Sequence, residues 1–172
     1  MKLNKTATML MCLSMVTASL IRPAQVRAAV TDADKQFLAM VEQANINEIK
    51  LSKLAEVKAS NPDVKAFASK MVAEHTNLSE NMKPFATAWG ITPPTDFDAD
   101  HQAVFEKLNS LSGADFDKAY MDAMDADHHK ALEAFTQEAD TTTDPKFKAA
   151  VMKGKSEVAA HTSMADALKA KL

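Results

Sequence analysis

Residues 61–75 read NPDVKAFASKMVAEH, and this stretch contains the features that decide the fold. Asn61 is a preferred N-cap and Pro62 fits the first position of a helix, so the pair predicts that a helix begins here. The apolar residues that follow lie three or four positions apart, which places them on one face of that helix. They are Val64, Phe67, Ala68 and Met71. His75 lies on the same face, where a buried side chain is expected.

The same periodicity extends over most of the chain and predicts four long helices and a short one. The expected helices cover residues 32–60, 62–89, 98–109 (the short one), 114–139, and a last segment opened by Asp144-Pro145. Pro84 is expected to kink the second helix or to fray its last turn. Two long hairpins, joined by a connection that contains the short helix, make an all-α antiparallel four-helix bundle.

Residues 1–28 have the organisation of a secretory signal peptide. Two lysines precede an apolar run at residues 7–21, and Val26 and Ala28 place small residues at the −3 and −1 positions, which predicts cleavage after Ala28. The run is shorter than the ~20 residues that a membrane anchor needs. We therefore expect a signal peptide at residues 1–28 and one bundle domain at residues 29–172.

Composition excludes several classes of function. The chain has 20 basic and 23 acidic residues, and residues 1–28 hold four of the basic ones and none of the acidic ones. The remaining 16 basic and 23 acidic residues give the expected domain a net charge of −7, which leaves no electrostatic surface for nucleic acid. The single cysteine, Cys12, lies in the expected signal peptide, so disulfides, thiolate zinc sites and cysteine nucleophiles are excluded. No later segment reaches 18 apolar residues, so we expect no transmembrane segment and a periplasmic or outer-membrane-associated location.

Polar side chains interrupt the apolar face of each long helix. Glu48, His75 and His161 lie on the faces of the first, second and fourth long helices. On the third, a rotation of 100° per residue places Asp127 near the centre of the face and His128 at its edge.

These side chains are also predicted to be level in the bundle. Glu48 precedes the turn at Asn61 by almost the same number of positions as His75 follows it. His128 and His161 are placed in the same way about the turn at Asp144, slightly further from it. The two pairs therefore differ in height by about 4.5 Å, less than one helical turn. One carboxylate and three imidazoles are expected to meet near the middle of the bundle.

Two arrangements satisfy such a cluster, because buried polar groups are costly when unpaired. The first is a metal site with Glu48, His75, His128 and His161 as ligands. Its outer members are Asp127, Tyr120, Met71 and Met124. Imidazole suits copper, zinc and iron, and thioether sulfur favours Cu(I). The second is a hydrogen-bonded network in which carboxylates accept from the imidazoles and the tyrosine hydroxyl.

Three further polar residues are predicted to lie outside this cluster. His101 is expected to be a surface or capping residue near the start of the short helix. His129 and Glu74 are expected to point away from the core.

Several motifs resemble a bacterial family of exported proteins classed as a domain of unknown function, whose members are often labelled outer membrane proteins. The motifs are NEIKLSKLA at 47–55, PDVKAFA at 62–68 leading to MVAEH at 71–75, FDKAYM at 116–121 leading to Asp127-His128, and His161. The resemblance implies a ferritin-like four-helix bundle and an exported location, and little about activity. Ferritin di-iron sites use Glu-x-x-His pairs, whereas Glu74-His75 and Glu157-x-x-x-His161 have other spacings, so a site for one metal ion is expected.

Two functions follow from these observations. One is an exported metal-binding protein that buffers metal or protects the envelope from stress, without turnover. The other is a structural or accessory subunit of a periplasmic or outer-membrane complex, which acts through protein partners or envelope association and has a hydrogen-bonded polar core. A single-metal oxidase or peroxide-consuming enzyme comes third, because it needs an open coordination position.

Overall fold

The computed structural model describes residues 30–172 and contains five helices in that range. They are α1 (Asp32–Lys58), α2 (Pro62–Trp89), α3 (Ala99–Ser110), α4 (Gly113–Thr141) and α5 (Pro145–Lys169). The all-α prediction is confirmed, with helix ends that differ from the predicted ones by one or two residues. The signal peptide predicted at residues 1–28 lies outside the described part of the chain.

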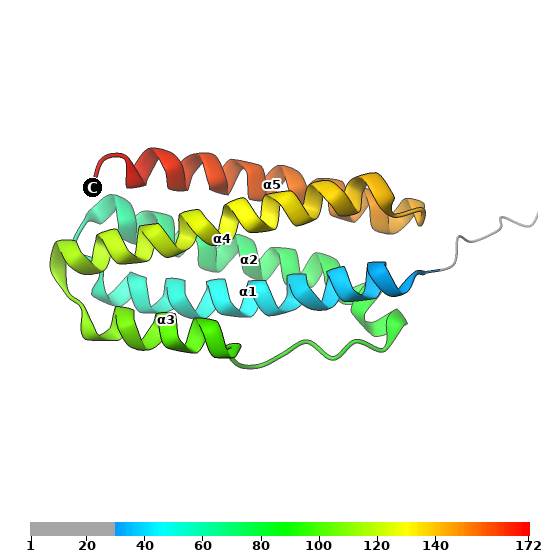
Figure 1. Cartoon of the computed structure of the whole chain (residues 1–172), viewed down its shortest axis with the longest axis horizontal. Coiled ribbons are helices and arrows are strands. Elements are labelled where there is room, and N and C mark those ends of the chain that lie inside the picture. The colour runs from blue at the N-terminus through cyan, green and yellow to red at the C-terminus, as the bar shows by residue number, and fades with distance from the viewer. Residues whose placement is uncertain (1–29) are drawn as a thin grey trace, which may run out of the picture.

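The four long helices form an antiparallel bundle (Figure 1). α1 packs against α2 and α4, and α5 packs against α4 and α2, so each long helix has two antiparallel neighbours. α2 and α4 begin at the same end of the bundle, so the chain must return along its length between them. The extended linker after α2 and the short helix α3 make this return, and α3 lies against α1 and α4.

The helix ends follow the local signals in the sequence. Asn61 and Asp144 accept backbone hydrogen bonds at the starts of α2 and α5, as preferred N-caps do. Gly90 ends α2 with a φ of 70°, a left-handed conformation that glycine adopts without steric cost. The last turn of α2 does not fray after Pro84, because the ring of Trp89 packs 4.6 Å from the ring of Phe147 on α5.

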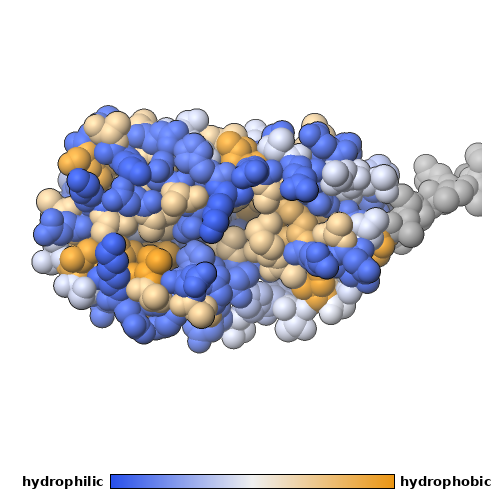
Figure 2. Space-filling model, viewed as in Figure 1, coloured by the Kyte–Doolittle hydropathy of each residue, from blue (hydrophilic) through white to orange (hydrophobic). Residues whose placement is uncertain are grey.

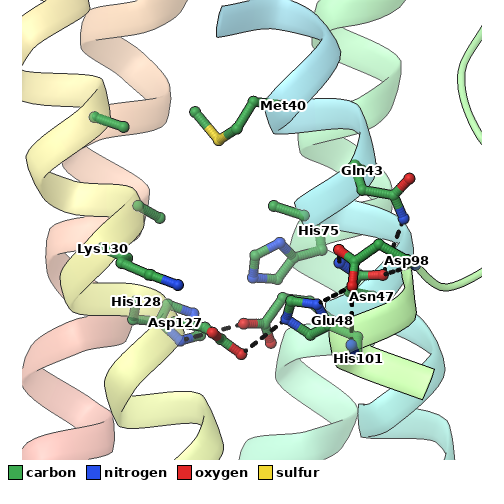
Figure 3. A pocket seen from close by; sticks show the side chains of 13 residues that line it. Met40, Gln43, Asn47, Glu48, His75, Asp98, His101, Asp127, His128 and Lys130 are labelled. Atoms are coloured by element: carbon green, nitrogen blue, oxygen red, sulfur yellow. Dashed lines mark hydrogen bonds and ion pairs between the residues drawn. The ribbon is translucent and has the colours of Figure 1, made fainter. Parts of the chain in front are cut away.

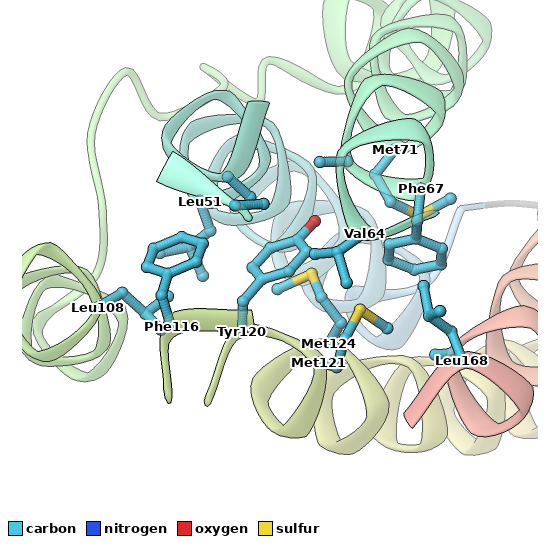
Figure 4. Packing of buried hydrophobic residues seen from close by; sticks show 14 residues of the cluster. Leu51, Val64, Phe67, Met71, Leu108, Phe116, Tyr120, Met121, Met124 and Leu168 are labelled. Atoms are coloured by element: carbon cyan, nitrogen blue, oxygen red, sulfur yellow. The ribbon is translucent and has the colours of Figure 1, made fainter. Parts of the chain in front are cut away.

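The apolar core consists of two clusters separated by a polar layer. One cluster surrounds Leu51, Phe67 and Tyr120 near the α1–α2 turn (Figure 4), and the other surrounds Phe37 and Phe147 at the opposite end. On α2, α4 and α5 a buried histidine, and on α1 the buried polar residues from Glu42 to Glu48, lie between the part that contributes to one cluster and the part that contributes to the other. The polar layer is therefore in the middle of the bundle. Between residues 30 and 172, every helix is too short or too polar to cross a membrane.

Candidate metal centre

Three histidines from three different helices meet in the polar layer. His75 on α2, His128 on α4 and His161 on α5 are exposed by only 5%, 1% and 2%. Their ring centroids form a nearly equilateral triangle with sides of 5.5, 5.2 and 5.3 Å. Each ring offers one nitrogen, and the three nitrogens lie within 4.8 Å of one another. The predicted convergence of the imidazoles is confirmed, and their role as metal ligands stays a prediction.

Each imidazole has one ring nitrogen engaged by an acceptor. His75 Nδ1 lies 2.9 Å from Asn45 Oδ1, and His128 Nδ1 lies 2.7 Å from the carbonyl oxygen of Met124. His161 Nε2 lies 2.6 Å from Glu74 Oε2. Carbonyl and carboxylate oxygens only accept, so these three ring nitrogens carry the protons.

The opposite nitrogens therefore carry lone pairs. They are Nε2 of His75, Nε2 of His128 and Nδ1 of His161, and each is buried without a hydrogen-bond partner among the described residues. Metal-ligating histidines use this arrangement, in which an acceptor on one nitrogen fixes the tautomer and the orientation of the other.

Burial keeps the imidazoles neutral. It lowers the pKa of His75 well below its usual value, and the neighbouring histidines lower it further. Burial also lowers the pKa of His128 to about 4. The pKa of His161 is lowered by burial as well, although the Glu74 carboxylate opposes the shift. Neutral imidazoles are the form that binds metal.

Glu48 lies beside this triangle rather than in it. Its Oε1 is 3.7 Å from Nδ1 of His128, the nitrogen that already donates to the backbone, and it is not among the three convergent groups. Burial raises the pKa of Glu48 well above its usual value. Its Oε2 has no hydrogen-bond partner among residues 30–172.

The predicted orientations of Asp127 and His128 are reversed in the structure. His128 points into the core, and the side chain of Asp127 is 26% exposed. The buried face of α4 extends further round the helix than the sequence prediction places it, because Met121 and Ala139 belong to it. That shift carries His128 inward and Asp127 outward.

The other outer members predicted for the site lie in the apolar cluster. Met71 and Met124 are fully buried there (Figure 4). The Tyr120 hydroxyl lies 2.8 Å from Ser52 Oγ. Within residues 30–172, Tyr120 is hydrogen-bonded to Ser52 on α1, and the predicted bond from Tyr120 to Glu48 or Asp127 is not formed.

Two residues that were placed outside the cluster belong to its surroundings. Glu74 was predicted to point away from the core, but it reaches across to α5 and accepts from His161. His101 does more than cap α3: its ring bridges Asp98 at 2.7 Å and Asp127 at 3.3 Å. These carboxylates, Asp127 first, raise the pKa of His101 to about 9. Only His129 lies as predicted, with a side chain that is 57% exposed.

Asn45, the hydrogen-bond partner of His75, was not predicted from the sequence. It lies three residues before Glu48 on the same inward face of α1, so the helical spacing could have predicted that Asn45 is buried near the histidines. Glu74 had no such signal, because its neighbour on α5 is 87 residues away in the sequence.

A cavity of about 430 Å³ lies between α1 and α4 and reaches the histidine layer. Figure 3 shows His75, His128 and Glu48 at its inner end and Met40 and Lys130 further out. α3 begins only at Ala99, so it covers one half of the α1–α4 face and leaves the other half open. On the molecular surface, that uncovered part is largely apolar (Figure 2).

The fold is shared with several solved structures. A DUF305 fragment from Deinococcus radiodurans superimposes with a TM-score of 0.73 at 14% identity, over 83% of this chain and 98% of that one. CopM in the Cu(II)-bound form gives a TM-score of 0.68 at 17% identity, over 80% and 96% of the two chains. CopM in an Ag-bound form gives 0.63 at 19% identity, over 77% and 92%. These TM-scores show a common helical-bundle fold, whereas the identities are too low to show more than the fold.

No curated protein matches the chain in sequence. The resemblance noted in the sequence is confirmed by a family model that matches residues 21–168, most of the chain. The protein therefore belongs to the family described as Domain of unknown function (DUF4142).

Proposed function

We propose that this protein is an exported metal-binding four-helix bundle that holds one transition-metal ion, foremost copper, on His75, His128 and His161. The observation that carries the proposal is the set of three lone pairs that face one another in a buried layer, each fixed by an acceptor on the far side of its ring. Nitrogen–metal bonds are about 2 Å long, and the three ring nitrogens already lie within 4.8 Å of one another. Small rotations of the imidazole rings would therefore bring all three nitrogens to one ion.

Copper is the first choice among copper, zinc and iron. Neutral imidazole suits all three metals, and copper has the highest affinity of the divalent first-row ions for a given site. CopM, which shares the fold, has been solved in Cu(II)-bound and Ag-bound forms, and this supports the choice. Ligation by three imidazoles without a carboxylate matches one ion rather than a di-iron pair.

The proposed role is to buffer metal or protect the envelope from metal stress. The signal peptide predicted at residues 1–28 would place the domain outside the cytoplasm, where it meets metal from the surroundings. The accessory-subunit alternative requires a polar layer whose hydrogen bonds are complete. Three imidazole nitrogens without partners among residues 30–172 argue against it.

The direct test is metal titration by calorimetry, with thermal unfolding as a second measurement. A ligand that binds only the folded state adds about 2.7 kcal/mol at a hundredfold excess over Kd, which corresponds to roughly 5–10 °C for a domain of this size. We expect one Cu(II) per chain and a rise of that order in the thermal midpoint. His75→Leu fills the space of the ring without supplying a lone pair, so it should abolish both effects while the protein still folds.

His129→Ala is the matched control, because His129 is next to His128 in the sequence but lies at the surface. It should leave copper binding unchanged. Stoichiometric binding that survives His75→Leu but is lost in His129→Ala would move the site to the surface. If copper, zinc and iron all fail to bind, the metal proposal is wrong and the accessory role takes its place.

A further inference from the structure

We infer that the cavity between α1 and α4 binds a small organic carboxylate, whose head group reaches the metal ion and whose hydrocarbon part lies between the two helices. This inference rests on the proposed function and adds a ligand to it. The cavity's volume of about 430 Å³ is within the range of small-molecule sites.

The cavity meets the metal layer on one side. It is lined by His75 and His128 but not by His161, so a molecule inside it lies against two of the three proposed ligands. An ion on three protein nitrogens has a fourth position for an exogenous ligand, as in catalytic zinc sites. Glu48 lines the same inner end of the cavity.

Charge favours an anion. The three imidazoles are neutral donors, so the charge of a divalent ion on them is not compensated by the ligand set. Three of the residues that line the cavity are acidic, and two of them, Asp98 and Asp127, are already paired with His101.

Lys130 adds a positive charge to the cavity wall. It forms no ion pair within residues 30–172, and its side chain extends into the cavity (Figure 3). It would attract an anion and not a free cation.

The walls favour a ligand with a hydrocarbon part. Met40 and Ala44 on α1 face Ala131 and Ala134 on α4, so the outer part of the cavity is apolar. Burial of each methylene group there should strengthen binding about fourfold, whereas acetate has no methylene group to bury. A six-carbon carboxylate should therefore bind more tightly than acetate.

The test uses Cu(II)-loaded protein titrated with hexanoate and with acetate, followed by calorimetry and by the Cu(II) electron paramagnetic resonance spectrum. We expect hexanoate to bind at least tenfold more tightly than acetate and to change the copper spectrum. We also expect the metal-free protein to bind hexanoate at least tenfold more weakly. Ala131→Phe fills the cavity, so it should abolish hexanoate binding while copper affinity stays the same.

Lys130→Gln removes an exposed charge without filling space and should weaken hexanoate binding several-fold. It keeps the inference testable if Ala131→Phe fails to fold. Copper binding with a spectrum that hexanoate does not change would overturn the inference and leave the proposed function standing. Hexanoate binding that neither substitution weakens would place the carboxylate elsewhere and overturn the inference. Failure of copper itself to bind would overturn both.

Discussion

A buried carboxyl pair at the end of the bundle far from the α1–α2 turn should make stability depend on pH. Glu138, in the last turns of α4, is 6% exposed and shares a hydrogen bond with Asp34, in the first turn of α1, which is 1% exposed. Two carboxylates this close cannot both ionise cheaply, so one must hold the proton. Burial, followed by the hydrogen bond and charge of Asp34, raises the pKa of Glu138 from 4.5 to about 7.

Glu138 stabilises the fold at low pH and loses this contribution as the pH rises. Because the folded state holds this proton more tightly than the unfolded chain, Glu138 contributes stability in full below pH 4.5, and this contribution is lost as pH rises through 7. A shift from 4.5 to about 7 corresponds to roughly 3 kcal/mol. Burial acts to raise the pKa of Asp34, but the hydrogen bonds from the backbone and side chain of Thr31 help to lower it overall. Asp34 therefore contributes the opposite dependence, and its stabilisation is lost as pH falls below 3.8. The pair should stabilise the fold most at about pH 4, between the two unfolded-state values, and its contribution should fall steadily from there to pH 7.

Glu138→Gln tests this reasoning, because an amide donates to the Asp34 carboxylate at every pH. Urea unfolding at pH 5.5 and pH 8.5 should show that the variant gains about 2–3 kcal/mol relative to wild type between the two values. The buried histidines and His101 also titrate, but they are present in both proteins and cancel in the difference. Glu133→Gln, an exposed change on the same helix, should show the same change in the free energy of unfolding between the two pH values as wild type. If Glu138→Gln also shows the same change as wild type, the shared proton is refuted.

Three further substitutions probe the packing and the site. Gly154→Ala should destabilise the fold by about 1–3 kcal/mol in urea unfolding, although alanine favours helix, because its Cβ would lie 2.5 Å from Cε1 of Phe135. Asn45→Ala removes the acceptor that orients His75, and calorimetry should show copper affinity reduced roughly 10–100-fold with the stoichiometry unchanged. Asp117→Ala should cost about 1–3 kcal/mol and speed proteolysis of the α1–α2 turn, because Asp117 accepts two backbone N–H groups and a hydroxyl from that turn. An unchanged value in any of these measurements would contradict the contact on which that prediction rests.

The fold could be predicted from the sequence because its signals are local. The N-cap and proline pairs at 61–62 and 144–145, the glycine after α2 and the helical periodicity each act within one or two turns. The last turn of α2 was predicted less well, since Pro84 is destabilising on its own. What holds that turn is an aromatic contact between Trp89 and Phe147, which lie on different helices and far apart in the sequence.

The positions of the polar side chains along the bundle axis could be predicted from the sequence, but the directions in which they point were predicted less well. Counting residues from each turn placed the polar side chains at one level, because every residue of a helix rises by the same distance, about 1.5 Å. The rotation of a helix about its own axis is set by contacts with neighbouring helices. For this reason the predicted rotation of α4 differs from the observed one, and His128 is more deeply buried than Asp127. The partners Glu74 and His101 act across helices, and no spacing within one helix reveals them.

The chemistry of the polar layer distinguishes a binding site from a device that only sets helix register. A register device works when every donor meets an acceptor, so that one alignment of the helices satisfies all groups and others do not. Here each imidazole has an oxygen acceptor on the outer side of its ring, supplied by Asn45, Met124 or Glu74. The unprotonated nitrogen of each ring, itself an acceptor, therefore points toward the other two rings. Acceptors cannot satisfy one another, and each buried unpaired group costs about 1–3 kcal/mol of a total stability of roughly 5–15 kcal/mol. A metal ion on this site would turn the cost into binding energy, because it would accept all three lone pairs and would bind only where the bundle has brought them together.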